Sequence, residues 1–181
     1  MLLHTPICDF GWKAPDFTLK DPDGTSHSFA DNLGGKGLVI AFICNHCPYV
    51  IAIAERLAQD TALLMGEGVN VLAVMSNDYE AVPADAPGAM KKFSAVHGFG
   101  FPYLVDEDQS VGRAYGAVCT PDFFGFDGLG ALQYRGRLDD AKMGDATGRT
   151  TELLDAMRLV AEVGRGPQRQ YPSMGCSIKW R

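Results

Sequence analysis

Two cysteines lie two residues apart in the string Cys44-Asn45-His46-Cys47-Pro48. A dithiol can form a disulfide and return to the reduced form, so it can exchange electrons with a substrate disulfide. Residues three positions apart lie on the same helical face, which brings the second sulfur within reach of a disulfide. The spacing therefore points first to redox chemistry at Cys44 and Cys47.

The flanking segments determine how reactive these thiols are. The apolar segment 38–43 precedes them and predicts a buried strand, and a helical pattern begins at Pro48. The first turn of a helix has free backbone N–H groups and the positive end of the helix dipole, which stabilise a thiolate. We therefore expect the pKa of Cys44 to lie below the free value of about 8.5. Cys44 is predicted to be the exposed nucleophile, and Cys47, deeper in the helix, the resolving thiol.

His46 lies between the two cysteines. As an imidazolium it would favour the Cys44 thiolate, stabilise the reduced form and make the disulfide more oxidising. A surface histidine at the start of a helix, with no tuning role, explains the residue about equally well.

Two other interpretations of the cysteine pair compete with catalysis. A zinc site needs two further ligands, yet the chain has no second CxxC, and His4, His27 and His97 show no ligand spacing. We therefore expect neither a metal nor a cofactor. Inert buried thiols are also common, but the position between a strand and a helix argues against them.

Length and composition indicate an ordinary globular protein. With 181 residues and 46% hydrophobic residues, we expect a single domain over residues 1–181, with residues 164–181 as a C-terminal tail packed on the body. The net charge of −6 and the pI near 5.1 provide no basic surface for nucleic acid or an anionic membrane. No apolar segment approaches the length of a membrane span.

Cysteine usage suggests the compartment. The five cysteines are unevenly spaced, unlike a secreted disulfide framework. The N-terminus shows neither a basic region nor a sustained apolar region, so no signal peptide is expected. These features favour a cytoplasmic protein, in a reducing compartment, whose cysteine pair is a catalytic dithiol.

Strands and helices alternate along the rest of the chain, which implies a parallel core. A turn at 21–24 predicts an N-terminal hairpin, and a turn at 127–130 predicts a late one. The remaining expectations are a helix from the cysteines to Met65, a strand at 69–75, a loop with two prolines at 82–88, a helix at 89–96, a strand at 102–105, and helices at 109–115 and 150–163. Ser76–Tyr79 follows the strand at 69–75, at the edge where open α/β sheets bind ligands, although an ordinary turn explains it equally well. In the tail, Ile178 and Trp180 are expected to pack on the body.

This order resembles the thioredoxin fold, with a CxxC after the first core strand and Thr120-Pro121 opening the late hairpin. The string Gly11-x-x-Ala14-Pro15-Asp16-Phe17-x-Leu19 is similar to the opening of the redoxin branch. That branch holds the alkyl hydroperoxide reductase/thiol-specific antioxidant proteins and the thioredoxin-like reductases of cytochrome maturation. The resemblance implies an α/β fold: a mixed central β-sheet flanked by helices, with an N-terminal β-hairpin extension and a C-terminal tail.

The resemblance also implies roles for individual residues. Cys44 and Cys47 match the nucleophilic and resolving cysteines. Thr120 and Pro121 match the cis-proline segment that faces the disulfide and pairs with the substrate backbone, so we expect a cis bond there, although only about 5–6% of X–Pro bonds are cis.

The chain departs from the family in several places. Peroxiredoxins carry a Thr or Ser three residues before the peroxidatic cysteine, where Cys44 has Ala41 and Cys47 has Cys44. Arg135 or Arg137 could serve as their peroxide-binding arginine, but a solvated strand-end charge is the favoured explanation for each. The strand before Cys44 contains no acidic residue that could serve as the family's buried proton acceptor, and Glu55 is a weak candidate for that role.

Cys119 and Cys176 form a separate hypothesis. Cys119 lies two residues before Pro121, so it is close to the active site if Pro121 faces Cys44. A tail that folds back could bring Cys176 near Cys119 and create additional redox thiols. Two buried structural cysteines are the favoured alternative.

The sequence therefore predicts an enzyme, a thiol–disulfide oxidoreductase that acts on a disulfide-containing protein or a small thiol or peroxide substrate, with a dithiol reductant as electron donor. The alternative is a peroxiredoxin-like thiol peroxidase with Cys44 peroxidatic and Cys47 resolving. A second alternative is a zinc-binding or non-catalytic redoxin, with His46 or Cys119 assisting the two cysteines.

Overall fold

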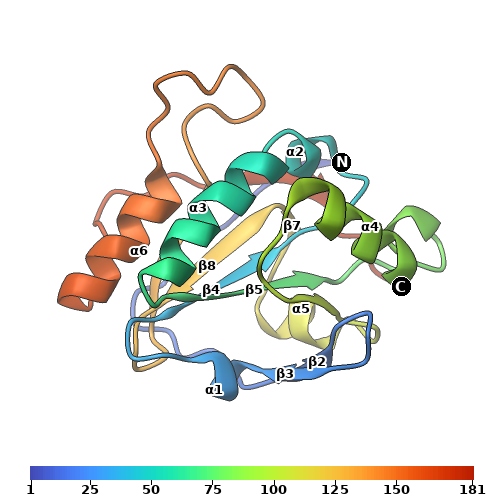
Figure 1. Cartoon of the computed structure of the whole chain (residues 1–181), viewed down its shortest axis with the longest axis horizontal. Helices are drawn as coiled ribbons and strands as arrows, with labels where there is room; N and C mark the ends of the chain where they lie inside the picture. The colour runs from blue at the N-terminus through green and yellow to red at the C-terminus, as the bar shows by residue number, and fades with distance from the viewer.

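The computed structural model describes all 181 residues and is built on a seven-stranded mixed sheet (Figure 1). The three strands at its centre are parallel: β4 (Leu38–Phe42) pairs with β5 (Asn70–Met75), and β5 pairs with β6 (Tyr103–Val105). Antiparallel strands complete both edges: β8 (Asp122–Phe126) and β9 (Leu132–Gly136) on one side, and β2 (Thr18–Lys20) and β3 (Ser26–Ser28) on the other. The mixed sheet and the N-terminal hairpin confirm the predicted thioredoxin fold.

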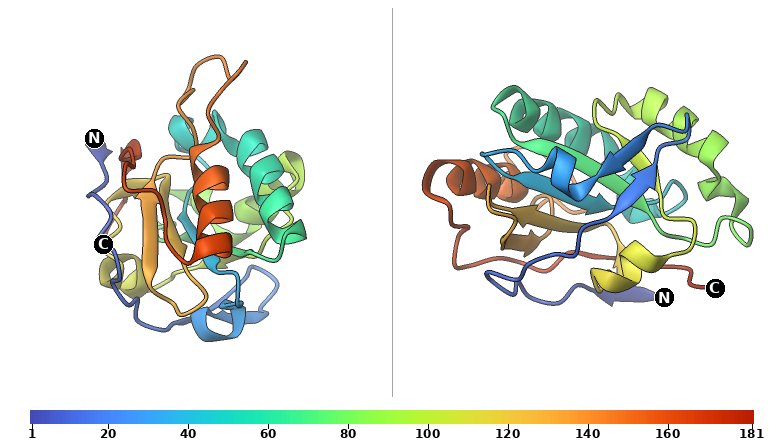
Figure 2. Two further views of the ribbon diagram at one scale, coloured as in Figure 1. Left: turned by 90° about the vertical axis from the view of Figure 1, so that its left-hand side faces the viewer. Right: turned by 90° about the horizontal axis from the view of Figure 1, so that it is seen from below.

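Helices cover both faces of the sheet (Figure 2). One face carries α3 (Ala54–Gly66), α4 (Pro87–His97) and α6 (Glu152–Val163), with the short α2 (Pro48–Ile51) at the end of β4. The other face carries α5 (Ser110–Ala114), together with Ile178 of the tail. A single short helix, α1 (Phe29–Asn32), follows β3. No helix has the length and apolar character needed to cross a bilayer.

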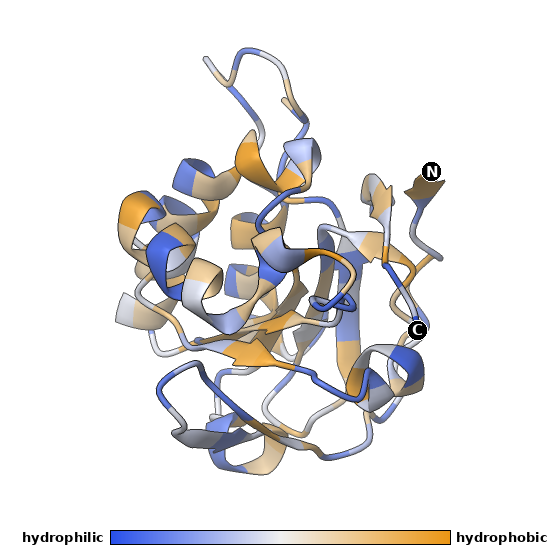
Figure 3. Cartoon of the chain, turned by 90° about the vertical axis from the view of Figure 1, so that its right-hand side faces the viewer, coloured by the Kyte–Doolittle hydropathy of each residue, from blue (hydrophilic) through white to orange (hydrophobic).

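The apolar sequence of β4 follows from its position between these two layers. Alternate residues of a strand point to opposite faces: Val39, Ala41 and Ile43 belong to the core under α3 and α6, and Leu38 and Ile40 to the core on the α5 side. All are fully buried, so no position could remain polar. Figure 3 shows the same pattern, with hydrophobic strands inside a more hydrophilic outer layer.

Two local predictions were wrong. The helix after the cysteines is interrupted between α2 and α3 at Ala52–Ile53, where the preceding Val50 and Ile51 are β-branched and restrict side-chain rotamers in a helix. The predicted loop at 82–88 is largely helical, because each proline occupies a first helical position: Pro83 in the 3-10 helix η1 (Pro83–Asp85) and Pro87 in α4.

The tail forms an element that the sequence did not reveal. Strand β10 (Met174–Ser177) lies antiparallel between β1 (Leu2–His4) and β7 (Cys119–Thr120) in a separate three-stranded sheet. Further along, Ile178 is buried and Arg113 lies over the Trp180 ring. The two ends of the chain therefore meet beside the segment that carries Thr120.

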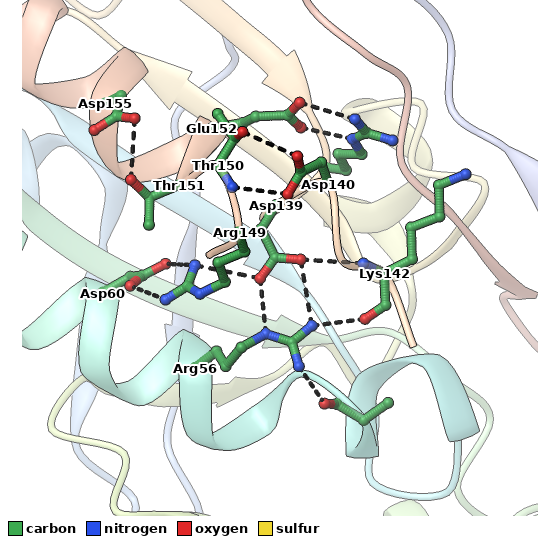
Figure 4. Close-up of polar contacts among 12 residues, drawn as sticks. Arg56, Asp60, Asp139, Asp140, Lys142, Arg149, Thr150, Thr151, Glu152 and Asp155 are labelled. Atoms are coloured by element: carbon green, nitrogen blue, oxygen red, sulfur yellow. Dashed lines mark hydrogen bonds and ion pairs between the residues drawn. The ribbon is translucent and has the colours of Figure 1, made fainter. Parts of the chain in front are cut away.

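A network of buried ion pairs fixes the long polar loop between β9 and α6 to α3 (Figure 4). Asp139, which is buried, accepts hydrogen bonds from Arg56 Nε at 2.7 Å and lies 3.2 Å from Arg149 Nη1. Arg149 also forms a bidentate pair with Asp60 of α3, at 2.6 and 2.8 Å. Bidentate arginine–carboxylate pairs combine strength with fixed geometry, so this loop is anchored near both of its ends, at Asp139 and Arg149.

Replacing Asp139 by asparagine is expected to lower the free energy of unfolding by about 2 kcal/mol, because two buried guanidinium groups lose their shared charge partner. Urea denaturation measures this change. Asp145→Asn is the matched control, since Asp145 is exposed and contacts only Thr147. An unchanged urea midpoint for the Asp139 variant would show that the network does not stabilise the fold.

Candidate active site

The strand β4 and the helix α2 position the two cysteines, but not as predicted. Proline disfavours a helical conformation in the residue before it, so Cys47 is extended (φ −72°, ψ 121°) and serves as the N-cap of α2, which begins at Pro48. Cys44 therefore precedes the helix instead of lying in its first turn. The predicted exposure was also wrong, since Cys44 is 1% exposed and Cys47 fully buried.

The segment Thr120-Pro121 lies directly against both sulfurs. Its peptide bond is cis, as predicted. Antiparallel pairing aligns Phe42 with Asp122, which places Pro121 beside the end of β4. Thr120 contacts both cysteines: its Oγ1 lies 3.2 Å from Cys44 Sγ, and its carbonyl oxygen lies 3.2 Å from Cys47 Sγ. The fold thus brings Cys44, Cys47, Thr120 and Pro121 together.

The two thiols titrate as a pair. The Cys44 thiol donates to the Cys47 sulfur, and together with burial and the nearby Asp85 carboxylate this raises the pKa of Cys44. The same interaction lowers the pKa of Cys47, assisted by the backbone N–H groups of Cys176 and Val50 and opposed by burial. The helix N-terminus therefore acts on Cys47, and one proton is shared between the two sulfurs.

A fully buried carboxylate, Asp85, lies beside this pair. Its Oδ1 accepts from the backbone N–H groups of Asn45 (2.8 Å) and His46 (3.3 Å). Its Oδ2 lies 2.7 Å from His46 Nδ1 and accepts from Asn77 Nδ2 at 2.8 Å. Asp85 thus fixes the turn between the two cysteines and supplies the acidic group that the sequence did not reveal.

Only one feature of the sequence pointed toward Asp85. It is an acidic residue between two prolines, in a segment that follows the polar set Ser76–Tyr79. Within that set Asn77 contacts the site, whereas Ser76 bonds to Asp106, Asp78 pairs with Arg181 and Tyr79 bonds to Glu107. The ligand-binding interpretation of this strand end therefore applies to one residue of four.

His46 is held by this carboxylate and is not a free surface residue. Its side chain keeps 28% of its surface exposed, whereas that of Asp85 keeps none. Asn45 is fixed as well, through the Ala84 carbonyl (3.0 Å) and the Tyr103 hydroxyl (3.1 Å). The turn between the cysteines is rigidly held, and its one partly open side lies at His46.

The ligand atoms of Cys44, His46 and Asp85 lie within 4.8 Å of one another. Three such groups could hold a cation in the manner of an open zinc site. Both carboxylate oxygens of Asp85, however, already accept hydrogen bonds from protein donors. A metal ion would have to replace these bonds, so the arrangement suits a dithiol better than a metal.

Other predicted residues lie away from the sulfurs. Glu55 is exposed, and no contact joins it to the site. Arg135 pairs with the buried Asp122 at 2.8 Å, and Arg137 pairs with Glu152 at 2.6 Å. Both arginines that could have bound a peroxide are therefore engaged with carboxylates.

A cavity of about 230 Å³ borders Pro121. Its walls include the apolar side chains of Tyr49, Ile53 and Met174, and Arg137 and Lys142 supply cationic groups. This cavity lies beside the cis-proline segment and is large enough for a small organic group.

Comparison with known proteins adds the following. Residues 10–136 match the family model described as the AhpC/TSA family. A structure of an uncharacterised conserved protein from Geobacillus kaustophilus is 40% identical and superimposes with a TM-score of 0.94 over 100% of this chain and 97% of its own. A Mycobacterium tuberculosis protein named as a candidate peroxiredoxin is 30% identical over 64% of this chain and 68% of its own. The thiol-disulfide oxidoreductase ResA of Geobacillus thermodenitrificans is 28% identical over 68% of this chain and 66% of its own.

Proposed function

Because this chain belongs to the AhpC/TSA family of redox enzymes, we propose that it is a thiol–disulfide oxidoreductase whose working group is the Cys44–Cys47 dithiol. The observation that carries the proposal is the contact of both sulfurs with each other and with Thr120, next to the cis proline. Such an arrangement holds two sulfurs ready to form one disulfide. Relatives named as thiol-disulfide oxidoreductases support the same chemistry.

Cys44 is the sulfur that we assign to the substrate. It lies on the side of the partly exposed His46, whereas Cys47 is enclosed by the Thr120 carbonyl, Val50 and Cys176. Cys44 attacks one sulfur of the substrate disulfide while its proton passes to the Cys47 thiolate, which already accepts that hydrogen bond. The first substrate sulfur leaves as a thiolate and takes a proton from water.

Cys47 completes the reaction. Its sulfur attacks Cys44 in the mixed disulfide, which releases the second substrate sulfur, and that sulfur leaves with the proton of Cys47. Two protein thiols are oxidised and one substrate disulfide is reduced. A dithiol reductant returns the Cys44–Cys47 disulfide to the reduced form.

A thiol peroxidase is the competing proposal, favoured by the Mycobacterium tuberculosis relative named as a peroxiredoxin. In that reaction a peroxide oxidises Cys44 to a sulfenic acid, with which Cys47 condenses. The engagement of Arg135 and Arg137 with carboxylates argues against it, because neither guanidinium is free to polarise a peroxide. The proposed compartment is the cytoplasm, since the uneven cysteine spacing is unlike that of a secreted disulfide framework.

A comparison of two oxidants tests the proposal. Reduced protein is mixed with insulin, as a protein disulfide, and separately with hydrogen peroxide, and the modification of Cys44 is followed by stopped-flow and mass spectrometry. We expect fast disulfide reduction and a slow peroxide reaction. Rapid formation of a Cys44 sulfenic acid would assign the protein to the peroxidases, and stoichiometric zinc in the purified protein would overturn both assignments.

A further inference from the structure

Strand β10 brings a third cysteine to the dithiol. In the antiparallel pair β10–β7, Cys176 lies opposite Thr120 and Ser177 lies opposite Cys119. The backbones approach so closely at Gly175 that a Cβ atom there would overlap the Thr120 carbonyl group. The tail is therefore fixed against the same residue that contacts both active-site sulfurs.

Successive side chains of a strand point to opposite faces, and this alternation decides which of Cys119 and Cys176 faces the active site. Residues directly opposite in an antiparallel pair point to the same side, and their neighbours point to the other. Cys176 accordingly shares the side of Thr120 and packs against the buried cluster that includes Cys44 and Cys47. There it also affects the pKa of Cys47. Cys119 takes the other side, where its thiol lies 3.9 Å from the Pro121 carbonyl. The tail thus folds back beside Cys119 as the hypothesis expected, but the Cys176 side chain faces the active-site cysteines and the Cys119 side chain points to the other side.

The three sulfurs differ in their access to solvent. Cys44 and Cys47 are buried, whereas Cys176 is half-buried. A disulfide between Cys44 and Cys47 would thus be largely enclosed, and a dithiol reductant would approach it only on the side of the partly exposed His46. A disulfide that included Cys176 would lie closer to the surface.

We propose that Cys176 is a third redox thiol, which attacks Cys47 in the Cys44–Cys47 disulfide. The Cys44–Cys47 bond breaks, a Cys47–Cys176 bond forms, and the proton of Cys176 passes to Cys44. The step is an exchange that leaves the total number of thiols and disulfides unchanged, so it needs no external oxidant. It restores the Cys44 thiol and moves the disulfide toward solvent, where a dithiol reductant reaches it. This inference rests on the proposed redox role of Cys44 and Cys47.

Disulfide mapping tests the exchange. The full chain with Cys44→Ser is oxidised with diamide, alkylated and digested, and its disulfides are identified by mass spectrometry. We expect a Cys47–Cys176 disulfide, which persists when Cys119→Ser is added and is lost when Cys176→Ser is added. A folded Cys44→Ser protein that forms no Cys47–Cys176 disulfide would overturn the proposal.

Two further measurements separate this inference from the proposed function. Mapping the oxidised wild-type protein asks whether a Cys44–Cys47 disulfide forms at all; its absence, together with the absence of any Cys47–Cys176 disulfide, would refute the proposed function. If the wild-type disulfide forms, Cys176→Ser is expected to slow its re-reduction by a dithiol, whereas Cys119→Ser, whose thiol lies on the other side of the strand pair, leaves that rate unchanged. Equal re-reduction rates for Cys176→Ser and wild type would refute the role of Cys176 alone.

The close approach of β10 offers an independent variant. Gly175→Ala in the Cys44→Ser protein is expected to displace β10 from Thr120 and suppress the Cys47–Cys176 disulfide. Gly66→Ala is the matched control, because a Cβ atom at Gly66 meets nothing within 4 Å. An undiminished yield of the disulfide in the Gly175 variant would contradict the role of the β10–β7 contact.

Discussion

Replacing Cys44 by serine is expected to slow turnover of a disulfide substrate by at least about 10³-fold, because the sulfur that attacks the substrate is lost. Replacing Cys47 by serine should instead trap the reaction half-way. The mixed disulfide between Cys44 and the substrate then accumulates, because no second sulfur releases it. Non-reducing electrophoresis and mass spectrometry detect this covalent complex.

The same pair of variants reveals which sulfur attacks. A covalent substrate complex in Cys47→Ser but not in Cys44→Ser assigns the attack to Cys44. The opposite pattern would assign it to Cys47, on which the thiolate is favoured. Cys119→Ser serves as the control, since Cys119 is buried near Pro121 but contacts neither sulfur through a hydrogen bond. Wild-type turnover in the Cys44 variant would refute the dithiol mechanism.

Replacing Asp85 by asparagine is expected to affect both stability and the thiols. The Asp85 carboxylate oxygens face four protein donors. In the asparagine variant an NH₂ group replaces one of these oxygens, so donors that bonded to it lose their acceptor. Buried donors without an acceptor lower the free energy of unfolding by about 3 kcal/mol. The carboxylate charge also contributes to the raised pKa of Cys44. Its removal should therefore lower the pKa of Cys44, favour the reduced dithiol and make the disulfide more oxidising.

Asp106→Asn distinguishes the two effects. Asp106 is equally buried and accepts hydrogen bonds from Ser76 Oγ and from the backbone of Val111 and Gly112. It should lower the urea midpoint in a similar way while leaving the reduction potential and the ultraviolet absorbance of the thiolate unchanged. Equal reduction potentials for Asp85→Asn and wild type would show that Asp85 has only a structural role.

The sequence predicted the helices and strands whose burial leaves a recognisable pattern of apolar residues. Strand β4 is covered on both faces and therefore reads as an unbroken apolar segment, and the cysteines follow it directly. The interruption after α2 was missed because a helical pattern of apolar residues continues across Ala52–Ile53. The strand β10 was missed because it has only four residues, one of them Gly175, and its partners lie far away in the chain.

The site was predictable only in part, because some of its residues come together only through contacts between distant parts of the chain. Cys44, Cys47 and Pro121 are recognisable from local strings and their order. Asp85 becomes part of the site only when β5 and the segment after it are placed beside β4. Its contacts with the turn between the cysteines span about forty positions, and no local spacing indicates them.

An extended peptide substrate would have to compete with strand β10 for the backbone groups of β7. A peptide that adds as a strand beside Thr120 would use the backbone groups that β10 already occupies. The competitor is part of the same chain, and a tethered segment acts at an effective concentration on the order of mM. A free peptide at micromolar concentration would lose this competition unless its side chains contributed additional affinity. A small disulfide that reaches Cys44 past His46 needs no vacant strand position, so the tail selects for compact substrates by mass action.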